Sequence, residues 1–162
     1  MNLNLNPPPF AAVHGIGVDI VETARIASSI ERFGDRFLRR VFTEAERAYC
    51  ASMPHPERHF GARFAAKEAV SKAFGTGIGA SVGWRDIEIL RRESGAPFIA
   101  LHGPAADLAT TLGITEALIS LSHSDHYAVA NALLITQARP PAESHPPAQA
   151  EPPSQPDRPS SI

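Results

Sequence analysis

The placement of proline limits where this chain can form a folded domain. Eight of its fifteen prolines lie within residues 140–162, and three more stand together at residues 7–9. Proline fixes φ and donates no backbone hydrogen bond, so neither end suits a regular helix or an interior strand. The C-terminal stretch also has few large apolar side chains to offset the entropy lost on ordering. We therefore expect a flexible lead over residues 1–12, one folded domain over 13–136 and a Pro-rich disordered tail over 137–162.

Composition and charge exclude several classes of protein. The formal net charge is −2, so the chain is no polycation, and we expect no nucleic-acid partner. It has neither a signal-peptide pattern nor a run of 18 apolar residues, so we expect a cytoplasmic protein without a membrane partner. Cys50 is the only cysteine, which rules out an intrachain disulfide and fits a reducing compartment. A structural role for Cys50 is favoured over a reactive one.

The first half of the domain predicts a strand followed by helices. Residues 13–21 form a short apolar strand that contains Gly15 and Gly17. A helix follows, because apolar residues recur with helical spacing, and Gly34 is a candidate break. Its apolar stripe consists of Ile26, Ile30, Phe33 and Phe37. The capping-box pattern of residues 43–46 starts a second helix. A third runs over residues 57–74 and ends at the glycines of residues 75–79.

The second half predicts two hairpins and a short helix. Residues 85–90 alternate in polarity and can pair with residues 98–101 across the Ser94-Gly95 turn. Pro104 and Gly113 bracket the helix. Residues 117–122 and 127–135 form the last hairpin. The mixture predicts an α+β domain, with a mostly antiparallel sheet packed against helices.

Two carboxylates are candidate metal ligands. Asp19 lies in the apolar strand, where an unpaired charge is costly, so it needs an arginine, helix N–H groups or a hard cation as partner. Glu68 lies within the third helix, four residues before Lys72, which is also the favourable order for an ordinary surface ion pair. Mg²⁺ often takes one or two carboxylates together with substrate phosphates. Residue spacing alone leaves both interpretations open.

Basic residues and glycines near Glu68 are candidates for anion binding. Arg63, Lys67 and Lys72 form either a solvated basic helix face or a phosphate site. The glycines of residues 75–79 follow a helix instead of opening one, so capping is the simpler explanation, although their backbone could approach a phosphate.

One histidine and a row of arginines could also serve function. His123, near the last hairpin turn, is either a hydrogen-bonded structural residue or a group that binds phosphate or transfers a proton. Arg25, Arg32 and Arg36 form a basic stripe on the first helix. This stripe is either a solvated face or a surface that docks an acidic protein.

Four segments, taken in order, resemble the holo-acyl-carrier-protein synthase family. They are GIGVDIVE (15–22), RVFTEAE (40–46), RFAAKEAVSKAFGTG (63–77) and LSHS (121–124). The resemblance covers about residues 13–136, and the third segment is its most specific part. The Pro-rich tail is not part of the family pattern.

The resemblance implies a fold, an activity and a set of site residues. It implies a 4′-phosphopantetheinyl transferase fold and a homotrimer with active sites between subunits. The expected reaction moves phosphopantetheine from coenzyme A to a serine of acyl carrier protein, in support of fatty acid biosynthesis. Asp19 and Glu68 match the Mg²⁺ positions of the family, and Arg25 and Arg36 match the arginines that dock the carrier. The coenzyme A positions are Arg63, Phe64, Lys67, Lys72, Gly75, Gly77 and His123.

The chemistry expected from the resemblance asks little covalent work of the protein. Mg²⁺ and basic side chains neutralise charge on the phosphate oxygens, and positioning supplies the rest. We expect Glu68 to accept the proton of the serine, with His123 as the competing base.

The rival hypotheses are a broad-range transferase for secondary-metabolism carriers, a non-catalytic module that binds coenzyme A, and a metal-dependent phosphohydrolase. The single-domain length disfavours a broad-range transferase. The two carboxylates disfavour a non-catalytic module, and the scarcity of further metal ligands disfavours a phosphohydrolase.

Overall fold

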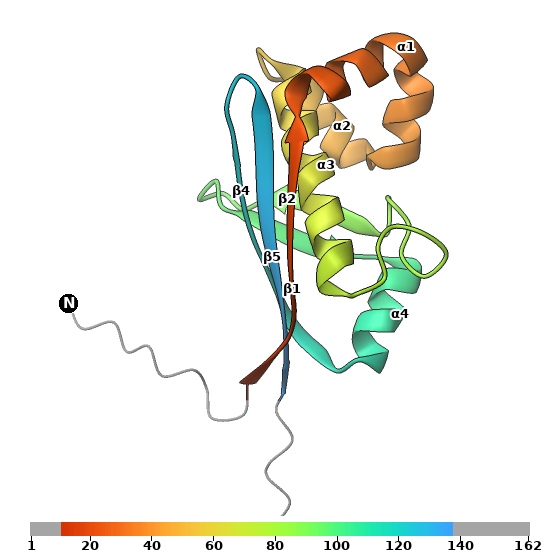
Figure 1. Cartoon of the computed structure of the whole chain (residues 1–162), viewed down its shortest axis with the longest axis vertical. Helices are drawn as coiled ribbons and strands as arrows, with labels where there is room; N and C mark the ends of the chain where they lie inside the picture. Colours follow the sequence, from red (N-terminus) through yellow and green to blue (C-terminus); the bar gives the residue numbers. More distant parts are fainter. Residues whose placement is uncertain (1–10, 138–162) are drawn as a thin grey trace, which may run out of the picture.

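The longest strands form one antiparallel sheet in the order β1-β5-β4 (Figure 1). The structure is a computed structural model that describes residues 11–137. The three strands are β1 (Ala11–Glu22), β4 (Ile114–His123) and β5 (Tyr127–Gln137). Most of the expected lead and tail lies outside the described residues, but β1 already begins at Ala11. The strand order follows from the chain itself, since β4 and β5 form a hairpin and β1 adds to the free edge of β5.

Three helices connect β1 to the second half of the chain. They are α1 (Thr23–Val41), α2 (Glu44–Ala51) and α3 (Pro56–Ala73). Gly34 interrupts α1 with φ 51° and ψ −135°, as its position in the sequence predicts. The capping box forms at the start of α2, where the Thr43 hydroxyl accepts from Glu46 N–H and the Glu46 carboxylate accepts from Thr43 N–H.

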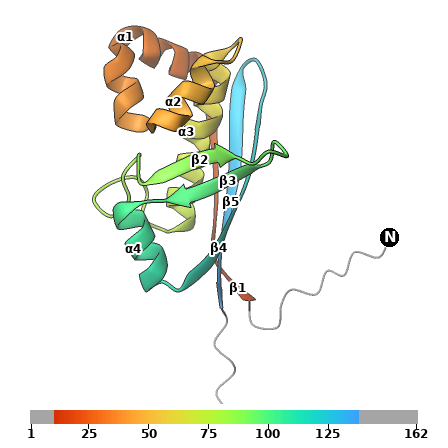
Figure 2. The same ribbon diagram turned by 180° about the vertical axis from the view of Figure 1, so that it is seen from behind.

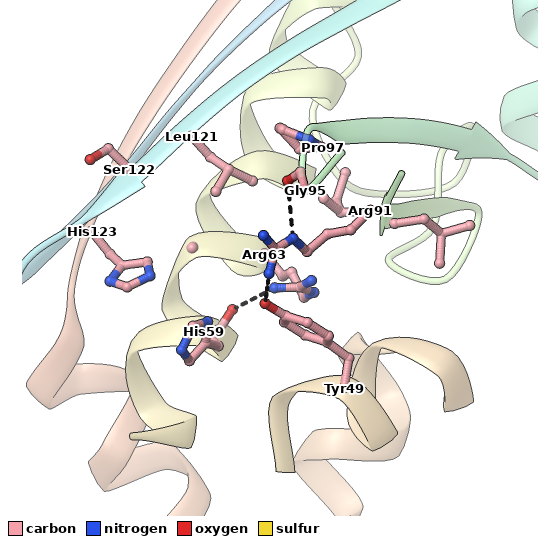
Figure 3. A pocket seen from close by; sticks show the side chains of 12 residues that line it. Tyr49, His59, Arg63, Arg91, Gly95, Pro97, Leu121, Ser122 and His123 are labelled. Atoms are coloured by element: carbon pink, nitrogen blue, oxygen red, sulfur yellow. Dashed lines mark hydrogen bonds between the residues drawn. The ribbon is translucent and has the colours of Figure 1, made fainter. Parts of the chain in front are cut away.

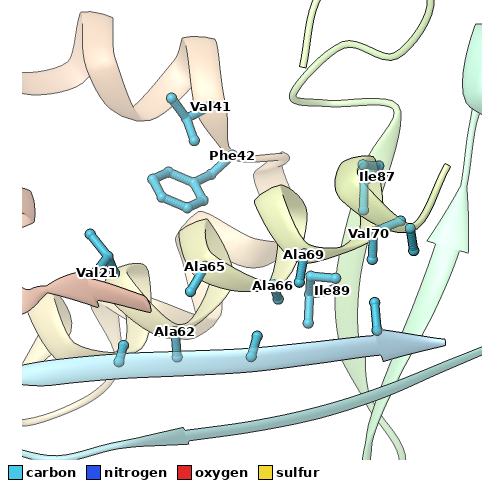
Figure 4. Packing of buried hydrophobic residues seen from close by; sticks show 14 of the residues in the cluster. Val21, Val41, Phe42, Ala62, Ala65, Ala66, Ala69, Val70, Ile87 and Ile89 are labelled. Atoms are coloured by element: carbon cyan, nitrogen blue, oxygen red, sulfur yellow. The ribbon is translucent and has the colours of Figure 1, made fainter. Parts of the chain in front are cut away.

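Helix α3 covers one face of the sheet with small side chains (Figure 4). Its buried residues include Ala62, Ala65, Ala66, Ala69 and Ala73. Glycines of β1 meet this alanine surface: a Cβ on Gly17 would overlap the carbonyl oxygen of Ala69, and one on Gly15 would overlap that of Ala73. Small residues on both elements therefore let the β1 backbone approach the backbone of α3 more closely than larger side chains would allow.

A second, two-stranded sheet packs against α3 and β4 (Figure 2). Strands β2 (Ile87–Arg91) and β3 (Pro97–Leu101) form the hairpin predicted around Ser94-Gly95, and α4 (Gly103–Thr111) follows. Ile87 and Ile89 point into the core, which alternation along β2 requires. These observations confirm the predicted α+β class and its antiparallel pairing.

The face of the three-stranded sheet that points away from α3 is apolar and exposed. On β1, Ile16, Val18 and Ile20 are 72%, 55% and 64% exposed. Leu133 of β5 pairs with both Ile16 and Leu118, which continues the apolar row across the sheet. No helix among the described residues is long and apolar enough to cross a membrane.

Candidate active site

Asp19 and Lys72 form an ion pair between β1 and α3. The Lys72 ammonium donates to Asp19 Oδ1 at 2.8 Å and to the carbonyl oxygen of Val18 at 3.1 Å. Asp19 is 17% exposed and Lys72 49% exposed, so the pair lies at the edge of the core and remains open to solvent. Within the described chain, the ion pair of Lys72 is thus with Asp19 of another element. The surface pair with Glu68 that the sequence allowed does not form.

Glu68 lies beside this pair, one helical turn before Lys72. Burial raises the pKa of Glu68, the negative charge of Asp19 raises it further, and Lys72 opposes the rise. The two carboxylates are therefore close enough to repel one another. Strand β1 and helix α3 thus bring together Asp19, Glu68 and Lys72, which are far apart in the sequence.

Oxygen ligands of this kind suit a hard divalent cation. Two carboxylates that repel each other, with an ammonium already drawn to one of them, favour a bound cation. No cluster of three or more His, Cys, Asp or Glu that could hold a metal ion occurs in residues 11–137. To hold Mg²⁺, Asp19 and Glu68 would therefore need further oxygen ligands, such as those of substrate and water.

Lys67 does not belong to a basic surface. Its side chain is fully buried and forms an ion pair with Glu46, Nζ to Oε2, at 2.8 Å. The same ammonium donates to the carbonyl oxygens of Trp84 and Ile87. A solvated basic face, one of the two alternatives that the sequence left open, is therefore excluded for Lys67. The three N–H groups of its ammonium already have acceptors, which disfavours contact with a coenzyme phosphate. Sequence spacing could not reveal this, because Glu46 lies on a different helix.

A cavity of about 440 Å³ lies between α2, α3, β2 and β4 (Figure 3). Arg63 packs its guanidinium 4.2 Å from the ring centroid of Tyr49, and Arg91 donates to the Tyr49 hydroxyl. His59 and His123 meet edge to face with ring centroids 4.8 Å apart. Burial lowers the pKa of His59, and the adjacent His123, Arg63 and Arg91 lower it further. The cavity is therefore rich in positive charge and suits an anion.

Arg63 has unused hydrogen-bonding capacity in this cavity. The residue is buried, and its Nε has no acceptor among the residues that the structure describes. A buried guanidinium N–H without an acceptor is costly, which favours a ligand that supplies one. Sequence analysis found Arg63 and His123 but missed Tyr49, His59 and Arg91. These come from three elements, and no local spacing connects them.

The other predicted residues lie elsewhere. Gly75 and Gly77 adopt positive φ at the end of α3, where the N–H of Gly75 bonds Lys72 O and that of Gly77 bonds Ser71 O. This is the helix-capping geometry that was the simpler explanation. Phe64 packs on Trp84 with ring centroids 4.7 Å apart, in a groove that Arg36 also lines. Arg25 and Arg36 are exposed on α1.

Cys50 is not placed to act as a nucleophile. Its side chain is fully buried, and burial raises the pKa of its thiol to about 12. The thiolate required for reactivity is therefore disfavoured. The structural role favoured from the sequence agrees with this environment.

Comparisons with known proteins connect this geometry to a family. The family model of the 4′-phosphopantetheinyl transferase superfamily matches residues 15–132. A holo-[acyl-carrier-protein] synthase from Koribacter versatilis is 52% identical over 120 residues, which cover 74% of this chain and 96% of that protein. The crystal structure of the Neisseria meningitidis synthase superposes with a TM-score of 0.72 at 32% identity, covering 76% of this chain and 98% of the other. The Helicobacter pylori synthase, solved in complex with coenzyme A, superposes with a TM-score of 0.67 at 33% identity, covering 74% of this chain and 98% of the other.

The fold and these matches define the class. The chain belongs to the 4′-phosphopantetheinyl transferase superfamily. Within the superfamily, its similarity is to the holo-[acyl-carrier-protein] synthases. The resemblance found in the sequence is confirmed.

The buried pair of Lys67 and Glu46 gives a testable stability prediction. Replacing Lys67 by Met leaves the Glu46 carboxylate buried without its cation, which should lower the free energy of unfolding by about 3–5 kcal/mol. Urea denaturation measures this change. The matched control is Arg39→Met, which removes the exposed ion pair with Asp35 and should cost at most about 1 kcal/mol. Equal, small losses in the two variants would contradict the structural role of Lys67.

Proposed function

We propose that this chain transfers 4′-phosphopantetheine from coenzyme A to a serine of apo-acyl carrier protein. The products are holo-acyl carrier protein and adenosine 3′,5′-bisphosphate, a reaction that supports fatty acid biosynthesis. The observation that carries the proposal is that one chain holds both the cluster of Asp19, Glu68 and Lys72 and the positively charged cavity, with α3 contributing residues to each. Membership of the superfamily supports the same reaction. The proposed location is the cytoplasm, which the buried free thiol of Cys50 permits.

The cationic cavity is the proposed site for the nucleotide end of coenzyme A. Arg63 and Arg91 offer guanidinium N–H groups to a phosphate, and Tyr49 offers an aromatic surface. His59 and His123 add positive charge when protonated. The Helicobacter pylori relative was solved in complex with coenzyme A, which supports coenzyme A as the ligand.

Asp19 and Glu68 are the proposed ligands of Mg²⁺. When bound, the ion would neutralise charge on the phosphate oxygens and orient them for substitution. Arg63 and Glu68 lie five residues apart on α3, so they project from different faces of the helix, about 140° apart. Strand β5 separates Asp19 on β1 from the cavity residue His123 on β4, so the carboxylates and the cavity of one chain lie at different edges of the sheet.

Glu68 is also the proposed general base. The serine oxygen of the carrier forms a bond to the phosphorus next to pantetheine, while the bond from that phosphorus to adenosine 3′,5′-bisphosphate breaks. The serine proton passes to the carboxylate of Glu68, directly or through a water molecule. His123 is the competing candidate, but it packs on His59 in the nucleotide cavity.

Helix α1 is the proposed docking surface for the carrier. Arg25 and Arg36 are exposed there, and opposite charge on the partner would speed encounter and set its orientation. Arg36 borders an apolar groove that also contains Phe33, Phe37 and Trp84. A partner with acidic side chains around an apolar contact would fit this surface.

Intact-mass spectrometry of an apo carrier protein tests the function. Incubation with the enzyme, coenzyme A and Mg²⁺ should add one phosphopantetheine to the carrier. Chelation should abolish the gain and added Mg²⁺ restore it, while Asp19→Asn and Glu68→Gln should slow it by about 100-fold or more because each removes a proposed metal ligand. Binding of coenzyme A without transfer to any of several carriers would favour the binding-module alternative. A Glu68→Gln variant with full turnover would exclude Glu68 as the base.

A homotrimer is the proposed assembly. The outer face of the β1-β5-β4 sheet exposes a row of apolar side chains, and burying them against a second copy would stabilise the association. A groove on this face, lined by Ile16, Leu118 and Leu133, could receive side chains of a neighbour. The same strand carries Asp19, so a subunit interface here would border the active site.

Light scattering during size-exclusion chromatography tests the assembly. The unchanged protein should elute with three times the mass of one chain, and Ile16→Glu should give monomers because it places a charge in the apolar row. Phe33→Glu is the control, since Phe33 is exposed on α1, away from this face. A monomeric unchanged protein, or an Ile16→Glu trimer, would contradict the proposed interface.

A further inference from the structure

The ammonium of Lys72 lies against Asp19, one of the two carboxylates proposed to bind the metal ion. Two donors of its ammonium contact β1, one at the Asp19 carboxylate and one at the Val18 carbonyl. These are oxygen acceptors of the kind that a hard cation prefers. Without a bound ion, Lys72 therefore supplies the positive charge that keeps Asp19 and Glu68 compatible, and it opposes the rise in the pKa of Glu68.

We propose that Lys72 is an exchangeable counter-cation that occupies Asp19 until coenzyme A arrives. The phosphates of the coenzyme then draw the ammonium away from Asp19, which frees the carboxylate for the divalent ion. Metal and coenzyme should accordingly bind cooperatively. This inference rests on the proposed metal site and deepens it, because it assigns to Lys72 the control of when that site can fill.

The mobility required of Lys72 follows from its surroundings. Its side chain is 49% exposed, and a flexible four-carbon stem carries the ammonium, so the side chain can change rotamer without moving α3. Lys67, five residues earlier on the same helix, is fully buried, and its ammonium is enclosed by three acceptors. One lysine is fixed as part of the core, while the other can exchange partners.

The energetic consequence is a coupling between two ligands. A divalent ion that binds the free enzyme must first displace the ammonium from Asp19, which weakens its apparent affinity. A coenzyme that engages Lys72 removes this competition before the ion binds. Because coupling free energies are reciprocal, the ion should strengthen coenzyme binding by the same factor.

Binding of Mn²⁺ to the unchanged protein and to Lys72→Met, with and without saturating coenzyme A, tests the inference. The loss of the free-ion electron paramagnetic resonance signal reports binding, after subtraction of the Mn²⁺–coenzyme complex measured without protein. Without coenzyme, Lys72→Met should bind Mn²⁺ about two- to fivefold more tightly, as expected for loss of a partly exposed ion pair. The ratio of affinities with and without coenzyme should fall by the same factor. Lys72→Arg keeps the charge and should preserve most of the coupling.

Each alternative gives a distinct result. If Lys72→Met tightens Mn²⁺ binding equally with and without coenzyme, the lysine acts only through its general electric field and the exchange is wrong. Unchanged Mn²⁺ affinity in Lys72→Met would also overturn it. If Asp19→Asn leaves Mn²⁺ affinity unaltered, the proposed metal site itself fails, whereas weaker binding in Asp19→Asn with no effect of Lys72→Met refutes the exchange alone.

Discussion

The close approach of β1 to α3 is the contact on which the site depends. There is no room for a side chain at Gly15 or Gly17. The carbonyl oxygens of Ala73 and Ala69 occupy the space where Cβ atoms on Gly15 and Gly17 would lie. Strand β1 carries Asp19, and α3 carries Glu68 and Lys72, so the spacing of the two backbones determines how the two carboxylates face each other. The absence of side chains at Gly15 and Gly17 thus lets the backbone of β1 lie close to that of α3.

A buried polar network holds the other wall of the site. Glu46 accepts from Lys67, from the backbone of Thr43 and from that of Ile89, so one carboxylate ties together α2, α3 and β2. Those elements supply Tyr49, Arg63 and Arg91 to the cationic cavity. A fully satisfied buried network is rigid, because breaking any member leaves a charge without a partner. The network therefore fixes the relative positions of the elements that form the cavity, including α3, which also carries Glu68.

Local patterns in the sequence predicted most of the fold. The capping box at Thr43, the break at Gly34 and the turn at Ser94-Gly95 depend on neighbouring residues, and the structure has all three. Asp19 and Glu68 were paired only through the resemblance, and the influence of Asp19 on the pKa of Glu68 now places them near each other. The buried ion pair of Lys67 was not foreseen because its partner, Glu46, lies on another helix. Tyr49, His59 and Arg91 were missed for the same reason, since periodicity does not report contacts between distant segments.

The Mg²⁺ concentration that gives half-maximal phosphopantetheine transfer tests the central claim most directly, when it is compared between Gly17→Ala and Gly61→Ala. A methyl group on Gly17 overlaps the Ala69 carbonyl, whereas one on Gly61 meets the Ala128 Cβ at 3.5 Å, an ordinary contact. If the approach of β1 to α3 sets the geometry of the carboxylates, Gly17→Ala should require about tenfold more Mg²⁺ or greater, as displaced metal ligands generally do. Gly61→Ala should resemble the unchanged protein. An unaltered Mg²⁺ requirement in Gly17→Ala would show that the carboxylates do not depend on this contact.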